Sequence, residues 1–156
     1  MANSHVLISS QTLGSATATV TFSSIAATYR DLRIIITGAA TASSNCFISL
    51  NGDTTATNYN WVWAMGNGTT ATSTTGNDRV FGNSQNAQGI MIYDFMDYSA
   101  TDKHKTNLAR TSFAGIETIM VAERWANTAA INSIAFTANA TTWTTGTTFY
   151  LYGVLA

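Results

Sequence analysis

Residues 116–125 read Ile-Glu-Thr-Ile-Met-Val-Ala-Glu-Arg-Trp, and their alternation indicates the fold class. Successive side chains of a β-strand point to opposite faces of the sheet. On that spacing one face carries Ile116, Thr118, Met120, Ala122 and Arg124, and the other carries Glu117, Ile119, Val121, Glu123 and Trp125. Alternation of this kind, with β-branched and aromatic residues, favours a strand over a helix.

The same pattern recurs along the chain. Residues 16–22 alternate threonine with alanine, valine and phenylalanine, and residues 31–37 are continuous enough to predict a central strand buried on both faces. Strong helix formers are sparse, and about nine predicted strands recur at roughly 10–15-residue spacing. We therefore expect an all-β fold, an antiparallel β-sandwich that is jelly-roll-like.

The chain shows no linker and no internal repeat. We expect residues 1–156 to form a single β-sandwich domain, with residues 1–15 as a candidate N-terminal arm. Residues 66–78, a run of Gly, Asn, Thr, Ser and Ala that ends in Asp, cannot cover a core and predict a long loop.

Charge is unusually scarce in this sequence. Only 10% of the residues are charged, against about 25% in an average soluble domain. A surface of Thr, Ser, Asn and Ala loses little hydration and side-chain entropy against a partner, which favours permanent assembly; a stable β-domain without a partner remains an equal alternative. The net charge of −1 and the scattered basic residues exclude a nucleic-acid partner and an anionic membrane partner.

The residues that carry chemistry do not form a recognisable set. Cys46 lies in a predicted strand and is expected to be a buried, inert thiol. His5 and His104 are far apart and belong to no metal-binding motif. Glu117 and Glu123 would lie about 20 Å apart along one strand, too far for a catalytic pair. We predict no catalytic residue, no metal and no cofactor, and hence a protein that is not an enzyme.

Two groups of residues are singled out for other reasons. Asn51, Gly52 and Asp53 predict a tight turn of the hairpin kind, because Asn-Gly readily adopts positive φ. The segment 54–78 and the N-terminal arm are expected to be contact surfaces, because neither is expected to order itself alone. The candidate partner contacts in the first of these are Tyr59, Trp61, Trp63, Asn67 and Thr69. The aromatic residues among them either pack in the core or stack on sugar rings.

Several short motifs follow one another in a characteristic order. They are Thr28-Tyr29-Arg30-Asp31-Leu32-Arg33-Ile34, Leu50-Asn51-Gly52-Asp53-Thr54 with Asn58-Tyr59, Gly66-Asn67-Gly68, Ile90-Met91-Ile92-Tyr93-Asp94-Phe95 with Tyr98, Ala130-Ile131-Asn132-Ser133-Ile134, and Gly146-Thr147-Thr148-Phe149-Tyr150-Leu151-Tyr152-Gly153-Val154. This series, from about residue 18 to residue 154, resembles the tail-fibre-like and head-decoration structural proteins of marine and cyanobacterial phages. The resemblance implies a structural role in a virion and transfers no catalytic residue.

Two functions follow as hypotheses. The first is a capsid decoration (cement) protein, a homo-oligomer expected to be a trimer, which binds the major capsid protein or other virion proteins. It would be located in the virion and assembled in the cytoplasm of the bacterial host, since no secretory signal is evident. The alternative is a tail or fibre component that binds host surface glycans by stacking Trp61 or Trp63 on sugar rings.

Overall fold

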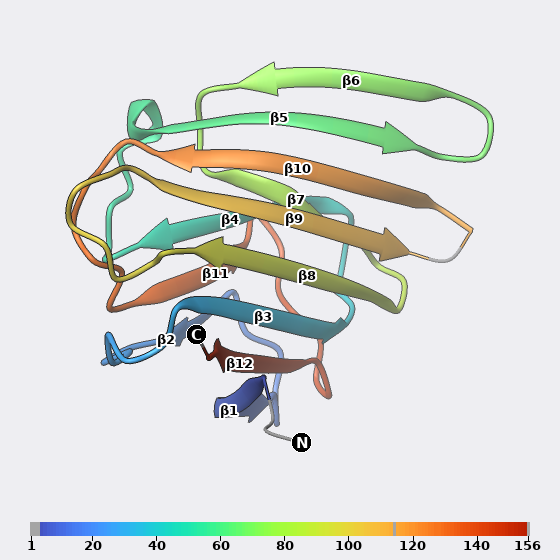
Figure 1. Ribbon diagram of the computed structural model, residues 1–156. Helices are drawn as coiled ribbons and strands as arrows, with labels where there is room; N and C mark the ends of the chain where they lie inside the picture. Colours follow the sequence, from blue (N-terminus) through green and yellow to red (C-terminus); the bar gives the residue numbers. More distant parts are fainter. Residues whose placement is uncertain (1–3, 114, 156) are drawn as a thin grey trace.

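The computed structural model describes residues 4–113 and 115–155, which form two antiparallel β-sheets packed face to face (Figure 1). The larger sheet has eight strands in the order β1 (His5–Thr12), β12 (Thr148–Val154), β3 (Asp31–Gly38), β8 (Gly89–Met96), β9 (Lys105–Phe113), β10 (Glu117–Trp125), β5 (Tyr59–Gly66) and β6 (Ala71–Gly76). The smaller sheet has four strands in the order β2 (Thr19–Phe22), β11 (Ile134–Ala138), β4 (Ser44–Leu50) and β7 (Val80–Ser84). One short 3-10 turn, η1 (Ala56–Asn58), precedes β5.

The predicted all-β antiparallel sandwich is confirmed. The alternation of apolar and polar residues matches the burial of the strands. In β9 and β10 every second side chain is buried between the sheets, and most of the intervening ones are exposed. The chain crosses repeatedly from one sheet to the other, so the core is closed by contacts between distant segments. Nothing helical within the described residues is long and apolar enough to cross a membrane.

Aromatic side chains from both sheets meet in the core. The ring of Phe136, on β11 of the small sheet, lies 5.2 Å from the ring of Tyr93 on β8 and 6.1 Å from that of Phe149 on β12, measured between centroids. Trp143 packs edge-on against Phe149 at 5.4 Å. These rings are fully buried, and each aromatic group of this size removes about 150–250 Å² from water.

The prediction of a long loop over residues 66–78 is wrong. Residues 71–76 form β6, which pairs in register with β5 at the margin of the large sheet (Figure 1). Only a short turn separates the two strands, and the Asn67 side chain closes it by accepting hydrogen bonds from the backbone N–H groups of Thr69 and Thr70. Threonine is β-branched and suits an exposed strand, but such a strand has no buried face to produce an apolar period.

The prediction that residues 31–37 are buried on both faces is also wrong. One face of β3 is buried in the core, whereas Arg33, Ile35 and Thr37 on the other face are half-exposed. The reason is that the large sheet has no layer on that side (Figure 1). Of the candidate N-terminal arm, residues 5–12 form β1, which pairs with β12, and residues 1–3 lie outside the described residues.

Candidate interaction surface

The turn that was predicted at Asn51-Gly52-Asp53 is present, with positive φ at Asn51 (53°) and at Gly52 (74°). It is not a hairpin, because β4 before it belongs to the small sheet and β5 after it belongs to the large one. The turn therefore carries the chain around the end of the sandwich. Positive φ at both positions suits Asn-Gly, because asparagine and glycine both adopt that region more readily than other residues do.

The Asn51 side chain ties this turn to a distant segment. Its amide nitrogen donates to the carbonyl of Ala130 at 2.8 Å, and its amide oxygen accepts from the backbone nitrogens of Asn132 at 2.8 Å and Ser133 at 3.2 Å. These bonds satisfy backbone groups that lie outside both sheets. Asn51 is thus a structural residue of the fold.

Asp53 anchors the other side of the same turn. Its carboxylate accepts hydrogen bonds from the indole of Trp125 at 2.8 Å, the amide of Asn58 at 2.8 Å and the backbone of Thr55 at 2.9 Å. Burial raises the pKa of Asp53, but these hydrogen bonds stabilise the charged form more strongly and hold the pKa at about 2. Tyr59 joins the group, since its hydroxyl donates to the Asp53 carbonyl at 3.0 Å.

The residues predicted as partner contacts lie in different environments. Tyr59 is only 1% exposed, so its side chain does not reach the surface of the chain. Trp61 and Trp63 lie on the side of β5 that faces the core and are half-buried, with ring centroids 5.1 Å apart. The indole of Trp61 donates to Asp78 at 2.7 Å and covers Gly76, where an added Cβ would clash with the ring.

Asn67 and Thr69 are exposed in the turn between β5 and β6. They are at the opposite end of β5 from Tyr59, so the structure does not bring the predicted contact residues together at one site.

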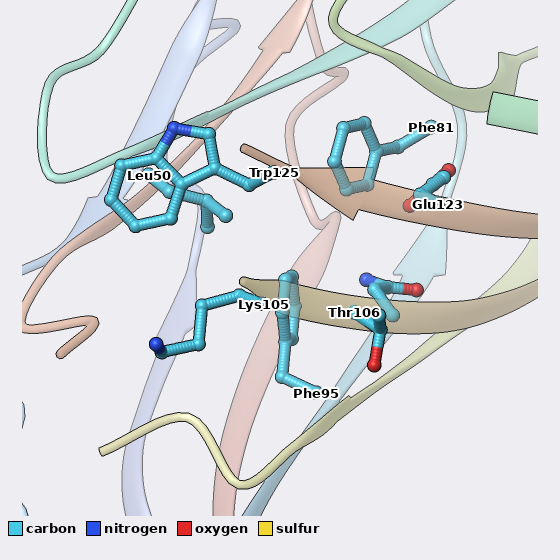
Figure 2. A pocket seen from close by; sticks show the side chains of 8 residues that line it. Leu50, Phe81, Phe95, Lys105, Thr106, Glu123 and Trp125 are labelled. Carbon is cyan, nitrogen blue, oxygen red and sulfur yellow. The ribbon is translucent and has the colours of Figure 1, made fainter. Parts of the chain in front are cut away.

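An interior pocket near the end of β9 and β10 holds ionisable side chains (Figure 2). Lys105 is 1% exposed, and its ammonium group donates to the backbone carbonyls of Lys103 and Thr128, both at 3.0 Å. Burial lowers the pKa of Lys105. The amine points away from Glu123, and the two side chains do not form an ion pair (Figure 2).

Glu123 is the buried carboxyl group of this pocket. Among the described residues, neither of its oxygens has a hydrogen-bond partner, and both side-chain polar atoms of Asn107, directly opposite on β9, are also without one. Burial raises the pKa of Glu123 well above its ordinary value, because the apolar interior disfavours the charged form. The Glu123 side chain is buried beside Phe81 and Trp125.

The remaining candidates for chemistry are structural. Cys46 is buried, as predicted; burial raises the pKa of its thiol to about 12, and the Tyr93 hydroxyl contacts its sulfur at 3.6 Å. Glu117 accepts hydrogen bonds from Asn83 at 2.8 Å and Gln85 at 2.7 Å. Within residues 4–113 and 115–155, no three His, Cys, Asp or Glu side chains lie close enough to hold a metal ion.

The most extensive candidate surface is the side of the large sheet that points away from the small sheet, here called the outer face. Cross-strand partners share a face, so the strand register assembles its side chains into rows. One row crosses the sheet through Val62, Ala122, Leu108, Asp94, Arg33, Tyr152 and Leu7. The next runs through Ala64, Met120, Arg110, Ile92, Ile35, Tyr150 and Ser10.

Two more polar rows flank these two rows, which combine apolar side chains with Asp94, Arg33 and Arg110. On one side lie Gly66, Thr118, Ser112, Ile90, Thr37, Thr148 and Thr12, and on the other lie Asn60, Arg124, Thr106 and Met96. Most of the large apolar side chains that are exposed belong to the outer face, namely Leu7, Val62, Ile90, Met96, Leu108 and Met120. The outer face therefore combines exposed apolar side chains with a few charged ones, and one of its flanking rows is rich in threonine.

This surface cannot be identified from the amino-acid sequence alone. Alternation marks Met120 and Ala122 as outward-facing, but the row exists only because β5, β10, β9, β8, β3 and β12 are neighbours in space. The sequence does show outward-facing apolar residues in several separate strands. It does not show the order of the strands in the sheet, which places these residues side by side.

Comparison of the chain with protein-family models, curated proteins and solved structures found no match. Within the described residues, the protein is a β-sandwich whose large sheet has one uncovered face with several exposed apolar side chains.

Proposed function

We propose that this protein is a structural protein of a bacteriophage virion, and specifically a capsid decoration (cement) protein that binds capsid subunits and stabilises the head. The observation that carries the proposal is the outer face, which exposes several large apolar side chains and which no element of the described residues covers. Exposed apolar patches are characteristic of interaction surfaces, because they lower the solubility of a protein that works alone.

Two further observations support a structural role. The chain carries charge on only 10% of its residues, and its buried ionisable groups are separated and inaccessible. The motif series from about residue 18 to residue 154 resembles phage virion structural proteins. The protein is proposed to act as a trimer that binds the assembled shell and not free subunits, so that binding shifts the assembly equilibrium toward the intact head.

The experiment that tests this proposal is the copy number of the protein in purified virions, measured by quantitative mass spectrometry against the major capsid protein. We expect a near-stoichiometric ratio. Absence from virions overturns the proposal, and a few copies or a few dozen copies assign the protein to the tail or to a vertex.

A tail or fibre component that binds host glycans is the second candidate. Tyr150 and Tyr152 favour it, because their half-exposed rings stack on the outer face with centroids 6.3 Å apart and planes at 25°. Such rings offer flat faces to a sugar. A glycan array supports this function if it detects binding that is lost in the Tyr152→Ala variant, with Trp61→Ala and Trp63→Ala probing the predicted alternative.

A further inference from the structure

We propose that the outer face docks on an acidic, apolar surface of a different protein of the virion shell, with Arg110 facing a carboxylate of that protein. The inference rests on the proposed function and adds to it the face that binds and the chemistry of the partner. Four properties of the outer face carry it: its size, its composition, its charge and the state of Arg110.

The outer face is large enough for a stable interface. Neighbouring strands lie about 4.8 Å apart and a strand rises about 3.3 Å per residue, so eight strands of about eight residues span roughly 34 Å by 27 Å. That is about 900 Å² before side-chain relief is counted, and a stable interface of standard size buries about 800 Å² on each partner.

The composition of the outer face matches that of protein interfaces in its aromatic, methionine and arginine content. Interfaces are enriched in Tyr, Met and Arg and depleted in Lys, Glu, Asp, Ser and Ala. The four described rows have no lysine or glutamate and include Tyr150, Tyr152, Met96 and Met120, although they also contain one aspartate and several serines and alanines. The two glutamates of the chain, Glu117 and Glu123, lie on the inner face.

The charge of the outer face selects the partner. Its rows carry three arginines, Arg33, Arg110 and Arg124, and one carboxylate, Asp94, which is a net charge of +2 on a chain of net charge −1. Two copies packed face to face would concentrate four positive charges in one buried interface, where like charges repel strongly. A partner with negative charge is therefore favoured over a second copy.

Arg110 locates the expected acidic contact. Arg33 is already neutralised, since its guanidinium donates to both Asp94 oxygens at 2.5 Å and 3.1 Å. Arg110 is exposed and lies between two apolar residues of the same row, Ile92 and Met120. It forms no ion pair with any other described residue. Covering it without a carboxylate would bury an unpaired charge, which is strongly unfavourable.

The contact can be tested by zero-length cross-linking. Arg110→Lys keeps the positive charge and introduces an amine, which a carbodiimide joins to a carboxylate in direct contact. We expect virions with this variant to give a cross-link from position 110 to an Asp or Glu of another virion protein. A cross-link to a second copy of this chain, or none from position 110, overturns the inference. Native Lys103, exposed in the β8–β9 turn and paired with Asp97 at 2.9 Å, serves as the control amine, which should cross-link within its own chain in both the free protein and the virion.

The face can be tested by thiol protection, because the single native cysteine, Cys46, is buried. Met120→Cys places a reactive thiol on the outer face, and Thr21→Cys places a matched one on the exposed side of β2 in the small sheet. We expect maleimide to label position 120 about tenfold more slowly in virions than in the free protein, as for a well-packed interface, and position 21 equally in both.

These outcomes separate the inference from the proposed function. If the protein is present in virions and position 120 labels there as fast as in the free protein, the docking face is wrong and the function stands. If the protein is absent from virions, the proposed function fails and the inference fails with it. Charge reversal adds a quantitative check: Arg110→Glu should lower copies per virion about tenfold, whereas Lys103→Glu, with the same change in net charge, should not.

Discussion

A strand of a β-sandwich usually has an apolar inner face and a polar outer face. The two faces of β10 differ from this pattern in opposite ways. The inner face packs Ile119, Val121 and Trp125 into the core but also holds Glu123, a carboxyl group with no hydrogen-bond partner. The outer face exposes Met120, 57% accessible, in an apolar row. A buried unpaired polar group opposes folding, whereas an exposed apolar one costs the single chain little. The requirements of folding therefore explain most of the residues on the inner face. The residues on the outer face are explained better by the assembly role proposed above.

The largest expected effect comes from placing the same charge on each face. Val121 is fully buried and its neighbour Ala122 is exposed. Val121→Asp buries an unpaired carboxylate and should lower the free energy of unfolding by about 4 kcal/mol or more. Ala122→Asp should change it by no more than about 0.5 kcal/mol. Urea denaturation followed by tryptophan fluorescence measures both, and equal losses in the two variants would show that the faces are not distinct.

Glu123 should make the protein less stable as the pH rises. Its pKa is raised in the folded state above the unfolded value of about 4.3, so the unfolded chain releases a proton that the folded protein retains. Stability is then fully present below pH ~4.3 and falls by about 1.4 kcal/mol per pH unit above it, until the folded pKa is reached. Glu123→Met removes the ionisable group and should stabilise the protein at pH 8 by about 1–4 kcal/mol.

Urea denaturation at a series of pH values from 5 to 9 tests this expectation. The difference between Glu123→Met and the native chain should grow with pH, and Glu123→Gln, which keeps the shape of the side chain, should show the same loss of pH dependence. A difference that stays constant with pH would mean that Glu123 is ionised in the folded protein.

Much of the fold could be predicted from alternation, because burial between two sheets imposes a period of two on each strand. The strands that were missed, β6 and β7, lack that signal. Residues 71–76 are almost entirely exposed and polar, and their strand is held by backbone bonds to β5. The strand at residues 80–84 is short and nearly all of its residues are buried, so it shows no alternation. Gly82, at φ 118°, also interrupts its regular extended backbone.

The turn at Asn51-Gly52 could be predicted because its cause is local, in the φ preferences of two residues. The bonds of Asn51 to residues 130–133 and of Asp53 to Trp125 could not, since they depend on where distant segments lie. The outer face could not be predicted for the same reason. Alternation shows which way Met120 and Ile92 point, but not that Arg110 lies between them.

A smaller effect is expected at the Asp53 turn, where a polar side chain at the end of the sandwich is fully satisfied. Asp53→Asn removes the charge that accepts three hydrogen bonds and should lower stability by about 1 kcal/mol at pH 7, after screening by solvent. The folded pKa of about 2 lies below the unfolded value of about 3.9, so this contribution is present above pH ~3.9 and lost as the pH falls toward 2.

Thermal unfolding of the native chain and Asp53→Asn between pH 2 and pH 7 measures the contribution of Asp53. The two curves should converge at the acid end. A gap that persists at pH 2 would indicate that the amide disrupts the geometry of the turn.

The smallest effect on stability is expected for Met120→Thr, and it bears most directly on the comparison of the faces. Met120 is one of the most exposed large apolar residues, and threonine suits an exposed strand position, so the free energy of unfolding should change by less than about 0.5 kcal/mol. If stability falls substantially, Met120 contributes to folding of the single chain and the outer face is not free for a partner. If stability is unchanged while fewer copies are found in virions, the apolar side chain at position 120 acts in assembly, which folding alone does not explain.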